Sequence, residues 1–142
     1  MKFLIDTNII LDVLLKRESL YNDGVKVLNL AKEDSINLYV SASAITDIYY
    51  IANQELRDKK AVKELLSKLI NIVLIASVSE DEIKNALVLP WRDFEDSVQY
   101  SVALLQEMDG IITRNSRDYE EAEIEIWKPE ELLSWWQTNR IL

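Results

Sequence analysis

The chain of 142 residues contains no cysteine and no histidine. Without cysteine it has no disulfides and no thiolate-bound zinc, and without histidine it has no imidazole base and no Ser-His-Asp triad. Only two glycines and two prolines occur, and no stretch rich in either marks a linker. Any catalytic site must therefore use other side chains, and carboxylates are the most abundant candidates.

Acidic side chains outnumber basic ones, with 25 Asp and Glu against 16 Lys and Arg and a formal net charge of −9. This excess argues against tight binding of nucleic acid over a broad basic surface, but not against an enzyme that contacts nucleic acid through a local patch and a bridging cation. The longest charge-free stretches, 35–46 and 69–79, are shorter than the roughly 18 apolar residues of a membrane span. No signal-peptide core precedes Asp6. We therefore expect a cytoplasmic protein that makes no use of a membrane.

Apolar patterning predicts short strands that alternate with helices. Runs rich in branched apolar residues predict strands at 3–5, 36–41, 72–76, 110–113 and 124–127. Apolar residues every three or four positions predict helices at about 9–14, 21–32, 44–56, 58–70, 79–89, 94–108 and 129–138. The alternation predicts an α/β protein, a three-layer α/β/α sandwich with a central parallel sheet. We expect residues 1–142 to form a single domain that includes the C-terminal helix.

The stretch 3–11 carries the first candidate functional residue. Three apolar residues run without a break into Asp6, and Thr7 and Asn8 then lead into an apolar helical pattern. Asp6 is thus expected at the C-terminal end of a buried strand, where open parallel sheets bind their ligands. The alternative is that Asp6 only caps the helix that follows.

Other acids are expected near the same edge of the sheet. Asp47 lies near the start of the helix after the second predicted strand, and Asp118 follows the fourth. Asp93 and Asp96 open the long helix before that strand, and their three-residue spacing places them on one side of it. Simpler interpretations remain open: Asp93 and Asp96 can serve as a helix cap, and Asp118 can be a solvated loop acid. Asp47 is harder to explain, because an unpaired charge in apolar surroundings is costly.

Carboxylates that gather at one edge favour metal chemistry. Four such groups within a few ångströms cannot all stay ionised alone, because like charges raise one another's pKa until a proton or a cation binds. Mg²⁺ binds carboxylates together with water and leaves positions for a substrate phosphate. Such ions activate water and stabilise charge on phosphoryl oxygens without any histidine. The residues alone therefore suggest metal-dependent hydrolysis of phosphate esters.

Four segments resemble, in order and spacing, the motifs of the PIN domain family, the nuclease fold of the VapC-type toxins. They are FLIDTN at 3–8, SASAITDIYY at 41–50, DFEDSVQY at 93–100 and ITRNSRDY at 112–119. The resemblance extends from residue 2 to about residue 127. It implies a parallel sheet flanked by helices, with acids at its C-terminal edge that bind Mg²⁺ or Mn²⁺ for RNA hydrolysis.

The resemblance also implies roles for individual residues. The catalytic acids would be Asp6, Asp47, Asp96 and Asp118, and the metal ligands would be Asp6, Asp96 and Asp118. Asp47 stands where the family usually has glutamate, one methylene longer, so we expect Asp47 to reach the metal through water. The supporting polar residues would be Asn8, Asp93, Thr113 and Asn115. The candidates for contact with RNA phosphates are Arg92, Arg114 and Arg117, with ion pairs to neighbouring acids as the alternative.

The implied protein is a metal-dependent endoribonuclease, the toxin of a type II toxin–antitoxin pair, with an RNA substrate, a small antitoxin partner and a homodimeric state. The alternative is a catalytically weak PIN-like module that binds RNA or a partner. A haloacid-dehalogenase-like phosphatase fits poorly, because it needs a second aspartate where Asn8 stands. A response-regulator receiver domain fits poorly too, because its paired acids and late lysine are missing.

Overall fold

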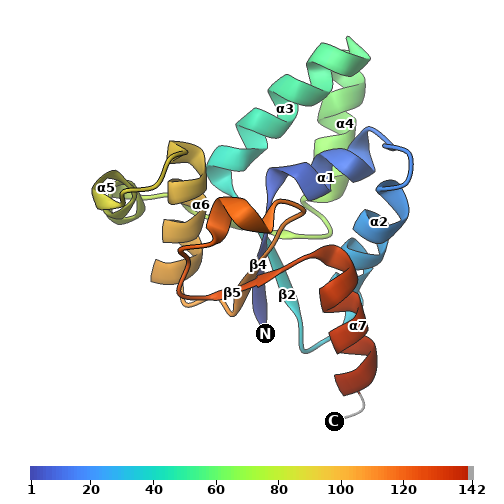
Figure 1. The fold of residues 1–142 in the computed structure, drawn as a ribbon. Helices are drawn as coiled ribbons and strands as arrows, with labels where there is room; N and C mark the ends of the chain where they lie inside the picture. Colours follow the sequence, from blue (N-terminus) through green and yellow to red (C-terminus); the bar gives the residue numbers. More distant parts are fainter. Residues whose placement is uncertain (141–142) are drawn as a thin grey trace.

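The central sheet of the computed structural model consists, within the described residues 1–140, of five parallel strands. They are β1 (Lys2–Ile5), β2 (Asn37–Ser41), β3 (Leu74–Ala76), β4 (Gly110–Ile112) and β5 (Glu125–Trp127). Their order across the sheet is β3-β2-β1-β4-β5 (Figure 1). The five strands and the parallel arrangement predicted from the sequence are confirmed. Ile141 and Leu142, which the single-domain prediction includes, lie outside the described residues.

Helices flank the sheet, as predicted, and most begin within two residues of the predicted position. They are α1 (Thr7–Leu14), α2 (Tyr21–Asn29), α3 (Ala42–Leu56), α4 (Lys59–Leu69), α5 (Glu80–Val88), α6 (Phe94–Leu105) and α7 (Pro129–Asn139). Two short 3-10 helices cover Leu30–Lys32 and Ser116–Tyr119. No helix among residues 1–140 combines the length and apolarity that crossing a membrane requires.

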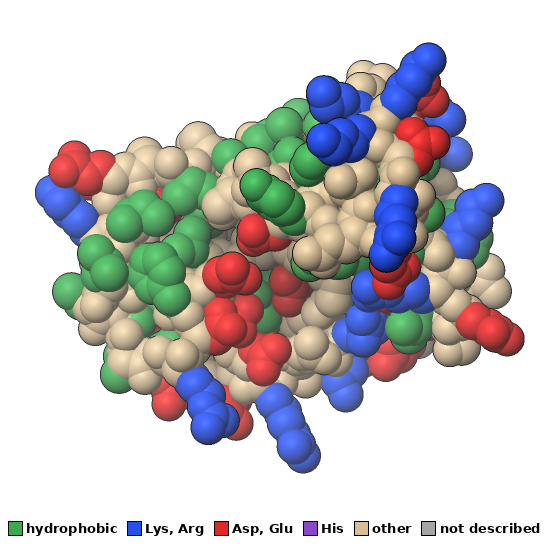
Figure 2. All heavy atoms as spheres, turned by 90° about the horizontal axis from the view of Figure 1, so that it is seen from above, with side chains coloured by type: hydrophobic (Ala, Val, Ile, Leu, Met, Phe, Trp, Pro, Cys, Tyr) green, Lys and Arg blue, Asp and Glu red, His purple; other side chains and the backbone are tan. Residues whose placement is uncertain are grey.

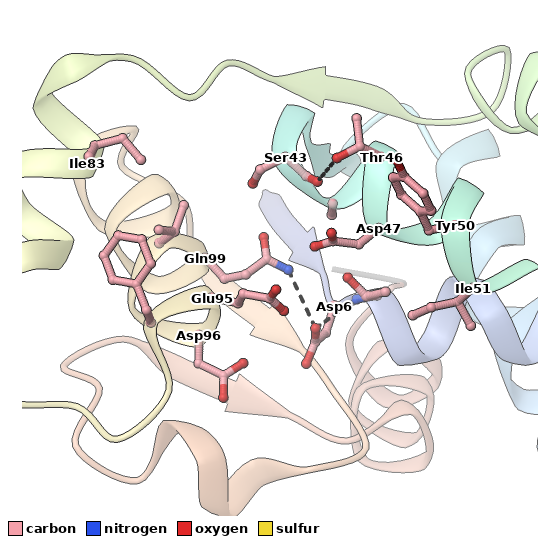
Figure 3. Close-up of a pocket in the computed structure, with 14 residues that line it drawn as sticks. Asp6, Ser43, Thr46, Asp47, Tyr50, Ile51, Ile83, Glu95, Asp96 and Gln99 are labelled. Carbon is pink, nitrogen blue, oxygen red and sulfur yellow. Dashed lines mark hydrogen bonds between the residues drawn. The ribbon is translucent and has the colours of Figure 1, made fainter.

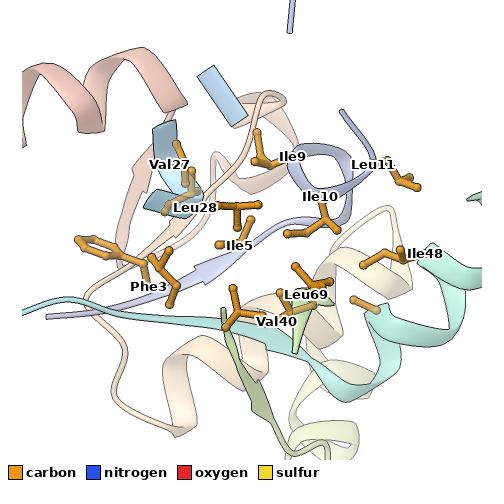
Figure 4. Packing of buried hydrophobic residues seen from close by; sticks show 14 of the residues in the cluster. Phe3, Ile5, Ile9, Ile10, Leu11, Val27, Leu28, Val40, Ile48 and Leu69 are labelled. Atoms are coloured by element: carbon orange, nitrogen blue, oxygen red, sulfur yellow. The ribbon is translucent and has the colours of Figure 1, made fainter. Parts of the chain in front are cut away.

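Two apolar cores lie on opposite faces of the sheet because side chains alternate along a strand. Phe3 and Ile5 of β1 face a core with α1, α2, α3, α4 and α7 (Figure 4). Leu4 faces the second core, which α5 and α6 cover. Figure 1 shows α5 and α6 on one side of the sheet and α1, α2 and α7 on the other. The three-layer prediction is therefore confirmed.

The strand order creates a crevice beside β1. The chain moves from β1 outward through β2 to β3, and then returns to place β4 on the other side of β1. In such a sheet the connections leave neighbouring strands in opposite directions, which opens a crevice at their C-terminal ends. The backbone N–H of Asp6 donates to the carbonyl oxygen of Ile112 (2.9 Å) at this point. The acid singled out in the sequence thus lies at the point where the strand order reverses.

The long helix α6 is shorter than the sequence pattern predicts. The apolar repeat suggested a helix as far as Met108, but α6 ends at Leu105. Glu107 has a φ of 55°, in the left-handed region, which a helix cannot continue through. Met108 is nevertheless buried (6% exposed), because the turn folds it back onto the same core. The repeat therefore identified buried positions correctly but not the end of the helix.

Candidate active site

Asp6 is held in place by four hydrogen-bond donors. Its Oδ1 accepts from the backbone N–H of Thr7 (2.7 Å), which makes it the N-cap of α1, and from Gln99 Nε2 (3.5 Å). Its Oδ2 accepts from Thr113 Oγ1 (2.8 Å) and from Asn8 Nδ2 (3.4 Å). The side chain both caps the helix and faces the crevice, so the two interpretations of Asp6 coexist. A residue that only capped α1 would not need hydrogen bonds from Thr113, just after β4, and from Gln99 of α6.

The surroundings of Asp6 disfavour its charge. Asp6 is only 8% exposed, and burial raises its pKa, while the hydrogen bonds from Thr113 and Thr7 act in the opposite direction. Burial is the larger effect because removal from water penalises the ionised form. The folded chain therefore holds a proton at Asp6 more readily than an ordinary aspartate does.

Asp96 enters the same crevice from the first turn of α6. Asp93 caps this helix, since its Oδ1 accepts from the N–H of Asp96 (3.0 Å), so the predicted capping interpretation of Asp93 is confirmed. The pKa of Asp96 is raised to about 7, first by burial and then by the charges of Asp93, Asp6 and Asp118. The charge of Asp6 is thus near enough to disfavour ionisation of Asp96.

Tyr119 connects the two acids, and the sequence did not single it out. Its side chain is 1% exposed, and its hydroxyl donates to Asp96 Oδ1 (3.4 Å). This hydrogen bond lowers the pKa of Asp96, and the nearby Tyr119 hydroxyl acts in the same direction on the pKa of Asp6. From the sequence, an aromatic residue in this position would be expected only to pack in the core. The ring of Tyr119 does pack against Trp91. Its hydroxyl is the part that belongs to the site.

The acids line a cavity of about 540 Å³ between α3 and α6 (Figure 3). Asp6, Asp47 and Asp96 face it together with Glu95, which the sequence interpretation missed. The pKa of Glu95 is raised, most of all by the charge of Asp47 and then by burial and by the charges of Asp93 and Asp6. Seen from above the C-terminal ends of the strands, acidic side chains gather around a hollow and basic ones lie toward the margins (Figure 2).

Asp118 lies in a different place from the other three acids. It belongs to the 3-10 helix Ser116–Tyr119 and lines a second, open hollow of about 910 Å³ with Arg92 and Arg117. Asp96 lines both hollows, and the charge of Asp118 contributes to its raised pKa. Asp6, Asp47 and Asp96 therefore share one cavity, whereas Asp118 adjoins only the Asp96 side of it.

Arg114 is engaged in an ion pair. Its Nε and a terminal guanidinium nitrogen donate to the two oxygens of Asp12 (2.6 and 3.2 Å), and Arg17 donates to the same carboxylate (3.3 Å). The Asp12 side chain is 2% exposed, so these arginines balance a buried charge. The ion-pair interpretation of Arg114 is the one the structure shows. In contrast, neither Arg92 nor Arg117 forms an ion pair within residues 1–140.

The predicted supporting residues act mainly through the loop after β4. Thr113 Oγ1 donates to Asp6 and also accepts from the backbone N–H of Asn115 (3.0 Å). Asn8 Oδ1 accepts from the backbone N–H of Arg114 (3.4 Å), which ties α1 to that loop. Asn115 contributes main-chain atoms, since its carbonyl oxygen also accepts from the N–H of Asp118 (3.0 Å). The Thr-Arg-Asn turn thus connects Asp6 with the helix that carries Asp118.

The oxygen atoms in the cavity suit a hard divalent cation. In the part of the chain that the structure describes, no three acidic side chains are grouped closely enough to hold a metal ion by themselves. The available donors are carboxylate oxygens and the Oε1 atom of Gln99, which is buried and has no hydrogen-bond partner among residues 1–140. Mg²⁺ and Mn²⁺ prefer such oxygens and retain several waters. The residues therefore fit a partly hydrated ion.

The family model described as "PIN domain" matches residues 2–117. The chain belongs to the PIN domain family. No curated protein matches it in sequence. The order of motifs, the parallel sheet and the acids at its C-terminal edge agree with this assignment, and the resemblance stated from the sequence is confirmed.

Solved structures show the same PIN fold at low sequence identity. A chain of VapBC2 from Rickettsia felis, bound to a promoter DNA fragment, is 16% identical with a TM-score of 0.70, covering 90% of this chain and 100% of that chain. VapC20 from Mycobacterium tuberculosis, described as a sarcin-ricin loop cleaving toxin, is 13% identical with a TM-score of 0.69, covering 87% of this chain and 96% of that chain. DNA-bound VapBC from Salmonella typhimurium is 15% identical with a TM-score of 0.70, covering 91% of this chain and 98% of that chain.

Proposed function

We propose that this PIN domain protein is a metal-dependent endoribonuclease and the toxin of a type II toxin–antitoxin pair. The observation that carries the proposal is the Asp6–Asp96 pair. Two carboxylates that are far apart in the sequence line one cavity beside the sheet's reversal point, and both have a raised pKa. Perturbed acids in a cleft are typical of catalytic sites. The solved VapBC structures and VapC20, described as a sarcin-ricin loop cleaving toxin, have the same fold and support the assignment.

The metal would be Mg²⁺ or Mn²⁺, held by Asp6, Asp96 and Asp118 with water completing its shell. When bound, such an ion stabilises negative charge on phosphoryl oxygens and helps to ionise water. The protein supplies orientation. Thr113 and Thr7 fix the two oxygens of Asp6, and Tyr119 fixes one oxygen of Asp96. Each carboxylate is thereby held in one rotamer before substrate arrives, which lowers the cost of reaching a reactive geometry.

Asp47 faces the cavity from α3, where it can accept a proton from a water that attacks the phosphodiester. Its shorter side chain keeps it further from Asp6 than the glutamate usual in the family would be. Arg92 and Arg117 lie beside Asp96 on the open hollow and are the proposed contacts to RNA phosphates. Arg114 has a structural role through Asp12 and is not among them.

The proposed setting is a cytoplasmic homodimer that a small antitoxin silences. The VapBC structures with the same fold are toxin–antitoxin complexes, which supports a partner of that kind. The alternative function is a PIN module that binds RNA or a partner with little cleavage. It is favoured by Asp47 in place of glutamate and by the lack of three closely grouped acids within residues 1–140.

The test is cleavage of a pool of structured RNAs by purified protein in Mn²⁺, Mg²⁺ or EDTA. Asp96→Asn should abolish metal-dependent cleavage, whereas Asp34→Asn, an exposed acid on another part of the chain, should cleave like the wild type. Cleavage that survives EDTA and Asp96→Asn would contradict the proposal. RNA binding without cleavage in any metal, by protein of normal thermal stability, would establish the binding module instead.

A further inference from the structure

Positive charge is concentrated on the outer face of α4 and the turn before it. Positions 57–68 hold five of the 16 basic residues and only two acids, in a chain whose formal net charge is −9. All five basic side chains are exposed, whereas Val62 and Leu69 on the inner face of α4 are buried in the core. The exposed charges are therefore not needed for packing. We call these five residues the α4 basic surface: Arg57, Lys59, Lys60, Lys63 and Lys68.

Neighbouring acids do not neutralise the α4 basic surface. None of its residues forms an ion pair within residues 1–140. Asp58 is engaged as the N-cap of α4, where its Oδ1 accepts from the backbone N–H of Ala61 (3.1 Å). Glu64 lies one helical turn from Lys60, yet these two side chains form no ion pair either. A net positive charge therefore faces solvent on this side of the molecule.

The placement of these charges opposes the stability of the helix. Acids stand in the first turns of α5, α6 and α7, where the helix dipole favours them, whereas α4 begins with Lys59 and Lys60. Lys59 and Lys63 are four residues apart, so their like charges repel on one face of the helix. Arg57 has a φ of 50°, a left-handed conformation that favours glycine or asparagine. Local stability thus accounts for none of these placements, whereas a bound polyanion would offset the repulsion.

The hairpin of α3 and α4 brings this surface to the same side of the molecule as the acidic cavity. α3 begins directly after β2 and rises beyond the C-terminal edge of the sheet (Figure 1). Asp47 faces the cavity from the first half of α3, and Leu56 ends the helix. At a rise of about 1.5 Å per residue, Leu56 lies roughly 14 Å beyond Asp47 along the helix axis. Basic side chains accordingly lie at the margin of the face whose centre is the acidic hollow (Figure 2).

The chemistry of the α4 basic surface fits a phosphate backbone better than a protein. Its four lysines border a shallow hollow together with Glu64 and Ser67, and no aromatic or large apolar side chain of the described residues lines it. Protein interfaces are depleted in lysine, and their energetic anchors are mostly aromatic residues and arginine. Lysine is, by contrast, a common ligand of nucleic-acid phosphates, where it positions the backbone without reading its sequence.

We propose that the α4 basic surface binds the phosphate backbone of RNA outside the active site, while one phosphodiester of that RNA occupies the acidic cavity. Acids line the cavity and no lysine or arginine of the described residues does, so the cavity itself repels phosphates. Attraction at α4 supplies the affinity that the cavity lacks and raises the local concentration of RNA. The inference rests on the proposed function for the identity of the nucleic acid, but binding is measured without cleavage.

The decisive measurement is the salt dependence of RNA binding, by fluorescence anisotropy of a labelled RNA hairpin. The parent protein carries Asp96→Asn so that the RNA stays intact. Adding Lys59→Gln, Lys60→Gln and Lys63→Gln should weaken binding about 10- to 100-fold at low salt and reduce the slope of log K against log salt by about 2 to 3. This triple glutamine variant loses charge but no buried side chain.

The matched control combines Lys2→Gln, Lys26→Gln and Lys32→Gln in the same parent. It removes the same charge from exposed positions on β1, on α2 and in the 3-10 helix Leu30–Lys32. The control should bind RNA much as the parent does. Equal affinities and equal salt slopes for the control and the triple glutamine variant would overturn the inference in favour of an acidic protein partner.

Arginine at the same three positions separates charge from structure. The variant with Lys59→Arg, Lys60→Arg and Lys63→Arg keeps the positive charge and should bind RNA as the parent does. The triple glutamine variant should melt no lower than the parent, because the charges that it removes repel one another. An equal loss of RNA affinity in the arginine and glutamine variants would contradict an electrostatic contact and overturn the inference.

Cleavage by protein with an intact Asp96 separates this inference from the proposed ribonuclease. The triple glutamine change should raise KM about 10-fold or more and leave kcat nearly unchanged, because α4 does not contact the reacting phosphate. Metal-dependent cleavage with an unchanged KM supports the ribonuclease and contradicts the α4 basic surface. Lysine-dependent RNA binding without cleavage in any metal supports the α4 basic surface and contradicts the ribonuclease. An RNA hairpin that the parent does not bind at low salt overturns the inference whatever the cleavage assay shows.

Discussion

Thr113 Oγ1 donates a 2.8 Å hydrogen bond to Asp6 Oδ2, joining two residues that are 107 positions apart in the chain. Both lie just past the C-terminal ends of adjacent strands, β4 and β1. Thr113 is fully buried, and its hydroxyl also accepts from the N–H of Asn115. One hydroxyl therefore fixes both the first acid of the site and the turn that leads to Asp118.

Thr113→Val should weaken folding and activity together. The change keeps the shape of the side chain but leaves the buried Asp6 Oδ2 with only the longer contact from Asn8. Hydrogen bonds to charged groups contribute about 1.5–3 kcal/mol, so we expect a loss of that size in the free energy of unfolding, measured with urea in EDTA. Thr113→Ser should retain most of the stability. A Thr113→Val protein as stable as Thr113→Ser would show that the hydrogen bond contributes nothing.

The stability of the metal-free protein should fall as the pH rises from about 4 to about 7. The folded Asp96 keeps its proton up to a pKa of about 7, whereas an ordinary aspartate loses it near 3.8. The folded state thus binds more protons in this window, and the free energy of unfolding decreases with pH until Asp96 is ionised in both states. Asp6, whose pKa is also raised, acts in the same direction.

Asp96→Asn provides the comparison for this pH dependence. The variant lacks this half-buried charge. In EDTA it should therefore unfold at a higher temperature than the wild type above pH 7, and its stability should depend less steeply on pH below 7. Asp34→Asn should follow the wild type. Parallel wild-type and Asp96→Asn profiles between pH 4 and 8 would mean that Asp96 ionises like a surface acid.

Tyr119→Phe should shift the acidic limb of the pH–rate profile upward. The Tyr119 hydroxyl lowers the pKa of Asp96 through its hydrogen bond, so its removal should raise that pKa further. The ring remains packed against Trp91, and thermal stability should change little. Tyr100→Phe is the matched control, because Tyr100 lies in the same core but its hydroxyl accepts from the N–H of Glu123. Identical profiles for the two variants would exclude a role for the Tyr119 hydroxyl.

Arg114→Met should destabilise the fold, whereas Arg114→Met combined with Asp12→Asn should recover much of the loss. Loss of one partner of a buried ion pair costs about 3–5 kcal/mol, and here Arg17 still contacts Asp12, so we expect a smaller value. A double-mutant cycle of urea unfolding measures the coupling. Additive effects of the two changes would show that Arg114 and Asp12 do not stabilise each other.

The fold was largely predictable because its strands contain short runs rich in branched apolar residues that alternate with helical patterns. Two strands carry a further signal, since Asp6 directly follows β1 and a Thr-Arg-Asn turn directly follows β4. The boundaries were less certain where burial continues past a helix. Met108 is buried and continues the apolar spacing of α6, although the helix has already ended and Glu107 has a left-handed conformation.

The site was predictable only in part because several of its residues resemble ordinary core or surface positions. Gln99 lies between the buried Val98 and Tyr100 on α6, and nothing in that order indicates that its amide reaches Asp6. Asp12 matched no motif, although it holds Arg114. Contacts of this kind depend on how α6 and the loop after β4 pack, which a single sequence does not encode in any local pattern.

The strand order has a consequence for protein synthesis. Asp6 is synthesised 107 residues before Thr113, which holds it, and Tyr119, which holds Asp96, follows later still. A partly made chain can pair β1 with β2 and β2 with β3. The crevice is nevertheless open on one side until β4 has been added to the other side of β1. On the proposed function, the nascent polypeptide is therefore harmless to the RNA of the ribosome that is still making it.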